Sequence, residues 1–229
     1  MGTTVFRKYP DSSKFEGMKV LNIGCGCRQF KTPNVTNIDA YEICHPDLVW
    51  DLSKTPLPFE DNSIDLIIAN HIFEHVPDWW ECFKDCGRML KEGGRLDIYV
   101  PGIGADSGLG YRDHINVINI HSFGGVAGTF RNESNAWEKH IYNSPANNLA
   151  LIKTEYVLEQ MPWMNKLNWL PNKWQKNMYN WMAFHLRNIV CEMGYIFQKV
   201  NDEKAKKINE WQINHSRQVD GECTRAIVG

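Results

Sequence analysis

Two glycines and one aspartate follow predicted buried strands, at positions where they could contact a ligand. Gly24 and Gly26 come directly after the apolar run Met18–Ile23, which is typical of a buried parallel strand that ends in a tight turn. Glycines at this place let a ligand approach the backbone at the carboxyl edge of the sheet, where open α/β folds bind their ligands. Asp39 follows the next predicted strand, Asn34–Ile38, and its carboxylate can accept hydrogen bonds from both hydroxyls of a ribose. A lone aspartate also serves as a helix cap or a solvated loop residue, but the spacing behind the glycine turn favours the ligand.

The glycine turn does not match two common nucleotide-binding motifs. The dinucleotide fingerprint needs a third glycine three positions after the second, and Gln29 stands there. No Gly-Lys-Ser or Gly-Lys-Thr of a P-loop follows the turn either. The sequence therefore disfavours a nicotinamide or flavin enzyme and offers no phosphate-binding loop.

The elements that must position these residues alternate between strands and helices. A helix is predicted after the glycine turn, kept short by Pro33. Further strands are predicted at 48–52, 64–69, 95–100, 148–158 and 192–200. Repeated strand, helix and strand units with short connections indicate a parallel sheet that is covered on both faces.

One helix is predicted with particular clarity, over Asp78–Lys91. Four side chains at spacings of three and four give it one apolar stripe, and they are Trp79, Phe83, Cys86 and Leu90. The glycine pair at 93 and 94 is expected to end the helix.

At this point the chain resembles a known family. The stretches MKVLNIGCG, NIDA, DLSKTPLPFEDNSIDLIIANHIFEHV and LKEGGRLDIYVP, which together span residues 18–101, are similar to class I S-adenosylmethionine-dependent methyltransferases. The resemblance is to the type 11 group, which is related to quinone-biosynthesis methyltransferases. It implies a Rossmann-like α/β fold with a seven-stranded mixed sheet, helices on both faces and an antiparallel last strand. It also implies S-adenosyl-L-methionine as the cofactor.

The resemblance assigns roles to individual residues. It implies that Gly24, Cys25 and Gly26 line the methionine part of the cofactor, and that Asp39 holds the ribose hydroxyls. Beside the adenine it places Ala40, Asp51 and Leu52, and near the methyl group it places Asn70 and His71. The chain departs from the commonest family pattern at Arg28, where many members have glycine or a small residue.

Methylation of an oxygen or nitrogen acceptor removes a proton, and histidines are the first candidates for the general base because imidazole titrates near neutral pH. His114 lies in the glycine-rich loop after the fifth strand, and it is the preferred base. His71 and His75 follow the fourth strand and are further catalytic candidates. Each of these histidines could instead pack or hydrogen-bond within a loop. Three more residues lie in the same loop as His114, and they are Tyr111, Asp113 and His121.

Composition and charge exclude several classes of protein. The chain has 229 residues, 43% hydrophobic and 23% charged, as in a globular protein. Its net charge of −2 and dispersed basic residues do not favour nucleic acid as a partner. Seven cysteines without framework spacing, no secretion signal and no long apolar run favour a cytoplasmic protein. Four of the thiols, at 25, 27, 82 and 86, do not have the spacing of a zinc knuckle, so no metal centre is predicted.

The chain is expected to form one methyltransferase domain over residues 1–200, followed by a polar helix and tail over 201–229. Within the domain, 102–147 is the predicted substrate loop region and 160–187 a tryptophan-rich insert. The insert could be core that covers the sheet, a lid over an apolar acceptor, or a patch for a second subunit or a membrane surface. The lid is preferred to the membrane. The protein is expected to be a monomer or a homodimer.

The predicted function is methyl transfer to a small molecule, lipid precursor or sugar. A catalytically silent S-adenosylmethionine-binding regulatory protein is the first alternative, and a protein or RNA methyltransferase is the second. No Asn-Pro-Pro-Tyr-like signature follows the fourth strand, where Asn70-His71-Ile72-Phe73 stands instead, which disfavours methylation of a base amino group.

Overall fold

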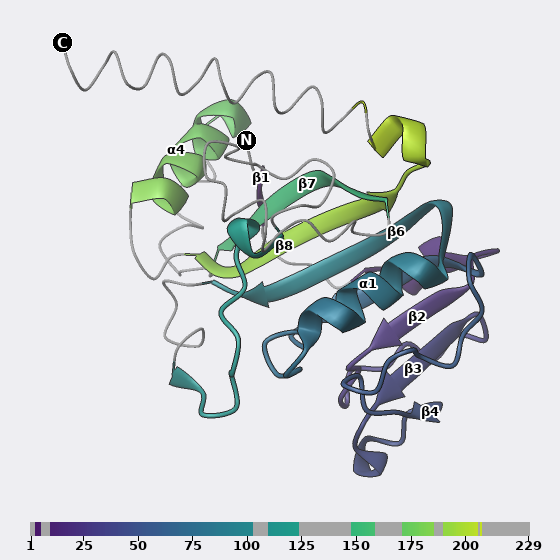
Figure 1. Cartoon of the computed structure of the whole chain (residues 1–229). Coiled ribbons are helices and arrows are strands. Elements are labelled where there is room, and N and C mark those ends of the chain that lie inside the picture. The colour runs from purple at the N-terminus through teal and green to yellow at the C-terminus, as the bar shows by residue number, and fades with distance from the viewer. Residues whose placement is uncertain are drawn as a thin grey trace, which may run out of the picture.

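One mixed sheet organises the chain (Figure 1). The computed structural model describes residues 3–5, 10–102, 110–123, 148–158, 171–185, 190–205 and 207. The strands are β1 (Thr3–Val5), β2 (Val20–Ile23), β3 (Val35–Asp39), β4 (Leu48–Val49), β5 (Ile64–Asn70), β6 (Leu90–Pro101), β7 (Leu149–Leu158) and β8 (Val190–Lys199). Their order in the sheet is β1-β7-β8-β6-β5-β2-β3-β4.

The topology is that of the predicted Rossmann-like sheet, with one addition. The last strand, β8, runs antiparallel to both of its neighbours, β6 and β7, while the pairs from β4 to β6 are all parallel. The seven predicted strands are therefore confirmed. The eighth, β1, pairs parallel with the far edge of β7 and was not predicted from the sequence.

The helix predicted after the glycine turn was wrong, because residues 24–34 contain no helix. Two buried asparagine side chains hold this connection in an extended path instead. Asn22 donates from its amide nitrogen to the carbonyl oxygen of Arg28 at 3.1 Å. Asn37 accepts from the backbone nitrogen of Phe30 and donates to its carbonyl oxygen, both at 3.0 Å. These bonds replace the backbone bonds that a helix would supply.

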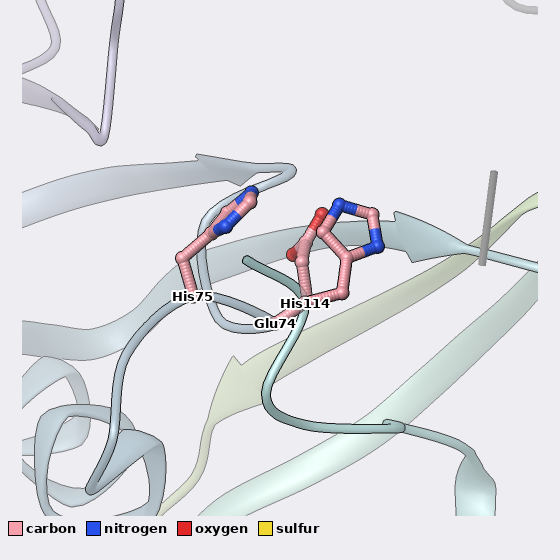
Figure 2. A group of neighbouring side chains, drawn as sticks. All are labelled: Glu74, His75 and His114. Atoms are coloured by element: carbon pink, nitrogen blue, oxygen red, sulfur yellow. The ribbon is translucent and has the colours of Figure 1, made fainter. Parts of the chain in front are cut away.

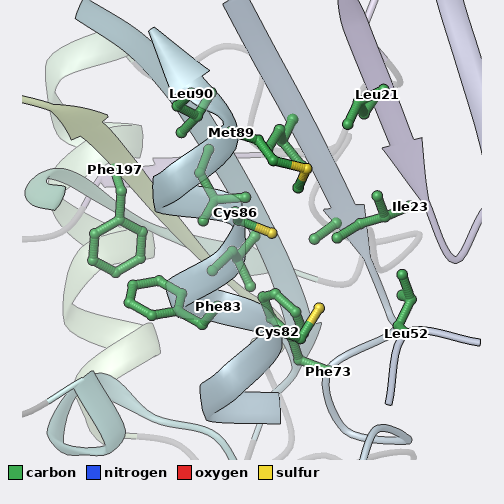
Figure 3. Packing of buried hydrophobic residues seen from close by; sticks show 14 of the residues in the cluster. Leu21, Ile23, Leu52, Phe73, Cys82, Phe83, Cys86, Met89, Leu90 and Phe197 are labelled. Carbon is green, nitrogen blue, oxygen red and sulfur yellow. The ribbon is translucent and has the colours of Figure 1, made fainter. Parts of the chain in front are cut away.

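The helix α1 (Trp79–Met89) confirms the other helical prediction and forms the main core. Asp78 caps it by accepting from the backbone nitrogen of Glu81. Its apolar stripe faces the sheet, where Phe83 and Cys86 are fully buried together with Phe197 of β8 and Ile23 of β2 (Figure 3). Burial of several large side chains on one face is the main force that fixes α1 on the sheet.

The glycine pair at 93 and 94 was expected to end α1, and this prediction was wrong. The helix ends at Met89, and β6 starts at once with Leu90. Gly93 has φ of 80° inside this strand, next to an irregularity in the pairing of β5 with β6 between Ile64 and Leu66. The pair therefore shapes a bulge in the strand.

The face of the sheet opposite α1 carries a smaller core. The short 3-10 helix η1 (Ser12–Phe15) places Phe15 against Val20 and Leu66, and Phe30 packs on this cluster at its edge. Beside it the described residues leave a cleft of about 700 Å³ that runs along the sheet from Asp65 to Asn70. Among the described residues, the helical cover of this face is thus much thinner than the cover by α1.

The helix α4 (Asn172–His185) is the described part of the predicted tryptophan-rich insert. It lies between the end of β7 and the start of β8 and contacts β1 (Figure 1). Trp174 and Trp181 are 69% and 55% exposed, so these two side chains are not the core that one interpretation of the insert required. No described helix is both long and apolar enough to cross a bilayer.

Candidate active site

The turn after β2 uses its two glycines for different purposes. Gly24 and Gly26 both have left-handed backbone conformations, with φ of 63° and 49°. A Cβ on Gly24 would lie 2.3 Å from Cγ1 of Ile72, whereas a Cβ on Gly26 would meet nothing within 4 Å. Gly24 therefore lets Ile72 pack onto the turn, and Gly26 is the glycine that borders open space.

Asp39 ties the glycine turn to the end of β3. Its side chain is 7% exposed, its Oδ2 accepts from the backbone nitrogen of Gly26 at 2.8 Å, and its Oδ1 accepts from that of Tyr41 at 2.9 Å. A carboxylate oxygen can accept more than one hydrogen bond, so both oxygens keep capacity for a diol. Asp39 thus lies at the predicted place, and it also holds the loop conformation.

The end of β4 supplies the next predicted residues. The backbone nitrogen of Trp50 donates to the carbonyl oxygen of Asp39 at 2.8 Å, which brings Asp51 beside Asp39. Asp51 is exposed, and hydrogen bonds from the backbone nitrogen and hydroxyl of Ser53 lower the pKa of its carboxyl. Leu52 is buried and Ala40 is exposed. The four residues predicted to surround the nucleoside are therefore adjacent in the fold.

His71 follows Asn70 at the end of β5 and is held by two carboxylates. Its Nε2 lies 2.9 Å from Glu192 at the start of β8, and its Nδ1 lies 3.2 Å from Oε1 of Glu74. Burial alone would lower the pKa of this imidazole, but the hydrogen bonds with Glu192 and Glu74 outweigh it and raise the pKa to about 9. His71 is therefore an imidazolium at neutral pH and cannot accept a proton there.

The other two predicted histidines lie side by side. The rings of His75 and His114 are 4.8 Å apart, and Tyr111 approaches His114 from the other side, with ring centroids 5.2 Å apart. Figure 2 shows these imidazoles together with Glu74 over the turn that follows β5. Nδ1 of His75 lies 3.1 Å from the carbonyl oxygen of Asp113. The structure thus brings the preferred base together with His75.

Backbone bonds fix the loop that carries His114 to this turn. The carbonyl oxygen of Glu74 accepts from the backbone nitrogens of Ile115 and Asn116 at 2.9 and 3.1 Å. The side-chain amide of Asn116 donates to the carbonyl oxygens of Phe73 and Val76 at 3.2 and 2.7 Å. The position of His114 relative to Glu74 and His75 is therefore set by the main chain.

The predicted residues do not all share one cavity. Gly24, Cys25 and Asn70 line one end of the cleft on the sheet face. The residues around Asp39 and the histidine pair are not among the described residues that line it. Of the remaining loop residues, Tyr111 and Asp113 are exposed, and His121 belongs to the 3-10 helix η3 (Ile120–Phe123). Most of the predicted loop 102–147 falls outside the described residues, as do residues 160–170 and 186–187 of the insert.

Sequence reasoning missed two residues that organise the site. Glu192 pairs with His71 across 121 positions of the chain, and Asn116 holds the turn at Phe73–Val76. No local motif marks either residue.

Comparisons with known proteins agree with this arrangement. A profile described as a methyltransferase domain, of type 11, matches residues 21–98. The chain is 32% identical to cycloartenol-C-24-methyltransferase 1 of Oryza sativa subsp. japonica, over 36% of this chain and 30% of that protein. It is 28% identical to demethylmenaquinone methyltransferase of Staphylococcus aureus, over 39% of this chain and 46% of that protein. The chain thus spans less than half the length of these curated relatives.

A solved structure shares the fold. It is described as a SAM-dependent methyltransferase from Archaeoglobus fulgidus, and it superposes with a TM-score of 0.56 at 15% identity, over 81% of this chain and 88% of that one. The matched profile covers β2 to β6, which carry the glycine turn, Asp39 and the turn after β5. Over residues 21–98 the chain is therefore similar to the type 11 methyltransferase domain, and its sheet has the fold of a SAM-dependent methyltransferase.

Proposed function

We propose that the chain transfers a methyl group from S-adenosylmethionine to a small-molecule acceptor. The observation that carries this proposal is the bond from the Gly26 backbone to Asp39, which joins the glycine turn and a buried carboxylate at the carboxyl edge of adjacent parallel strands. Open α/β folds bind nucleosides at this edge. One relative is named as a demethylmenaquinone methyltransferase and another as a sterol 24-C-methyltransferase. Both names refer to small-molecule acceptors, which supports an acceptor of this kind here.

The residues present fit the cofactor. Gly26 leaves space for a ligand beside the backbone, and both oxygens of Asp39 retain lone pairs for the ribose hydroxyls. Asn70 lines the cleft next to Gly24, at the end where the amino-acid part is expected. S-adenosylmethionine supplies an activated methyl group when it is bound.

The protein's own contribution to such a reaction is positioning. The acceptor, the methyl carbon and the sulfur must lie in line, and water must be kept out. The position of α4 supports a role in excluding water, because it lies in the connection from β7 to β8, at the same edge of the sheet as the glycine turn. Its exposed Trp174 and Trp181 provide apolar surface, which supports the lid interpretation of the insert.

We assign the loss of the acceptor's proton to His114, and a substitution tests this role. His114→Ala is expected to lower turnover on an oxygen or nitrogen acceptor by about 10²-fold or more, the usual contribution of a positioned acid–base group. The affinity for S-adenosylmethionine should stay within about twofold, because His114 does not line the glycine turn. Steady-state kinetics and titration calorimetry measure the two quantities. Unchanged turnover would show that His114 has no role in the loss of the proton.

The proposed activity as a whole is tested by an acceptor panel. The chain is incubated with S-adenosylmethionine and hydroxylated, amino and enolic small molecules, and release of homocysteine from the S-adenosylhomocysteine product is followed. Turnover on at least one class of acceptor, lost in Asp39→Ala, is the expected result. Binding of the cofactor without turnover on any acceptor would overturn the proposal.

A silent cofactor-binding protein is the second candidate, and one observation favours it. Ile72 packs directly onto Gly24, so the glycine nearest to the strand is covered by a side chain. A regulatory protein needs only the nucleoside end of the site, at Asp39. Binding without turnover across the panel is the result that this candidate predicts.

A further inference from the structure

A buried carboxylate and two imidazoles meet at the turn after β5. Donor atoms of Glu74, His75 and His114 all lie within 4.8 Å of one another (Figure 2). Two of these residues are neighbours in the chain, and the third is brought in by the loop that Asn116 fastens to the turn. A metal ion that binds ligands at about 2.0 to 2.2 Å needs donors at most about 4.4 Å apart, so small side-chain rotations suffice.

Two residues of this cluster, Glu74 and His114, have a buried polar atom without a hydrogen-bond partner among the described residues. Glu74 is only 1% exposed, and its Oε2 has no hydrogen-bond partner among the described residues, while its Oε1 lies near His71. Nδ1 of His114 is also buried without a hydrogen-bond partner in the described part of the chain. Buried polar atoms without partners are costly, and a ligand that accepts their lone pairs removes that cost.

The second imidazole has the tautomer that a metal requires. Nδ1 of His75 lies 3.1 Å from the carbonyl oxygen of Asp113, and a carbonyl can only accept, so this nitrogen carries the proton. Nε2 is then left with a lone pair. A hydrogen bond from one ring nitrogen to a carbonyl or carboxylate is the usual arrangement for a histidine that binds metal through the other nitrogen. The carboxylate of Asp113, 3.4 Å from the same ring nitrogen, adds negative charge beside the cluster.

We propose that Glu74, His75 and His114 bind one divalent transition-metal ion such as Zn²⁺. Two imidazoles and one carboxylate form a donor set that suits zinc and its neighbours and leaves a coordination position open. The sequence alone does not indicate this site, because His114 is far from the other two ligands in the chain.

The three ligands lie on the turn after β5 and on the loop fastened to it, beside the edge of the sheet where the acceptor is expected. An acceptor with a hydroxyl or enol oxygen is therefore the class that this site favours, because such an oxygen can bind the ion and becomes more acidic there. This part of the inference rests on the proposed methyl transfer, whereas binding of the metal does not. His114 would then promote loss of the proton by holding the ion.

Equilibrium dialysis of the chelator-treated chain against Co²⁺ tests the site. One Co²⁺ per chain is expected, with the absorption of a nitrogen and oxygen ligand set and without the sulfur-to-metal charge-transfer band that the cysteines would give. His75→Ala and His114→Ala should each weaken binding by about 100-fold, since each removes one of three protein ligands. His45→Asn is the matched control and should bind as the wild type does. His45 is exposed and lies outside the cluster, and asparagine tolerates its φ of 51°.

The possible outcomes separate this inference from the proposed function. Absence of stoichiometric Co²⁺, or Co²⁺ that remains in both histidine variants, would overturn the metal site. A charge-transfer band from sulfur would do the same, because it would place the ion on the cysteines. Calorimetry with S-adenosylmethionine in the absence of metal reports on the cofactor site alone, so either idea can fail while the other stands.

Discussion

Gly24→Ala is expected to lower the free energy of unfolding by about 2 to 5 kcal/mol. The left-handed conformation at φ of 63° costs an alanine roughly 1 to 2 kcal/mol. The new methyl group would also lie 2.3 Å from Cγ1 and 2.5 Å from Cβ of Ile72, and such overpacking adds about 1 to 3 kcal/mol. Urea unfolding, followed by circular dichroism, measures the change.

Gly26→Ala is the matched control for this prediction. It carries the same backbone cost at φ of 49°, but its Cβ meets nothing within 4 Å, so a loss of only about 1 to 2 kcal/mol is expected. Ile72→Ala in the Gly24→Ala background should recover part of the loss, because it removes Cγ1 and Cδ1 and leaves only the Cβ contact. Equal destabilisation by the two glycine substitutions would show that Ile72 does not pack on Gly24.

Asp39→Ala is expected to weaken binding of S-adenosylmethionine by about 10- to 100-fold, which corresponds to roughly 1 to 3 kcal/mol. Two effects act in the same direction. The variant loses the acceptor for the ribose hydroxyls, and it releases the backbone nitrogens of Gly26 and Tyr41 that shape the turns. Titration calorimetry with the cofactor measures the affinity.

Asp65→Ala separates these effects from the general cost of losing a carboxylate. Asp65 also accepts two hydrogen bonds, from the backbone nitrogen of Lys19 at 2.8 Å and from Nζ of Lys91 at 2.7 Å, but it lies at the opposite end of β5 from the glycine turn. The variant should lose stability and keep its affinity for S-adenosylmethionine. An Asp39→Ala variant that binds as tightly as Asp65→Ala would remove Asp39 from the cofactor site.

The strands could be predicted from the sequence because their signals are local. Continuous apolar runs such as Ile64–Ala69 end at turn residues, and burial on both faces of a parallel strand requires this composition. The stripe of α1 was equally clear, since its spacing of three and four places Phe83 and Cys86 on one face. Local periodicity therefore settles where these elements lie.

The errors came from tertiary contacts that override local preference. The connection after Gly26 was predicted as a short helix, but the side chains of Asn22 and Asn37 hold it extended from β2 and β3. The pair Gly93-Gly94 has the composition of a helix end, and pairing with β5 draws it into β6. Neither competing contact is visible within a short window of sequence.

Part of the site could be predicted, because the order of the strands along the chain fixes which turns lie at the same edge of the sheet. The turns after β2, β3 and β5 meet at one edge of the sheet, so chain order and the family resemblance together place Gly26, Asp39 and His71 near one another. The partners of His71 could not, since Glu192 arrives from the last strand and changes a candidate base into an imidazolium. Ionisation depends on such distant contacts, and the sequence does not encode them locally.

The central claim is that a nucleoside is held between the glycine turn and Asp39, and a crystal structure with S-adenosylhomocysteine tests it most directly. We expect both ribose hydroxyls within about 3 Å of the Asp39 carboxylate, with the amino-acid end near Gly26 and Asn70. A nucleoside seated elsewhere, for example along the cleft on the sheet face, with Asp39 bonded to Gly26 and Tyr41 alone, would contradict it.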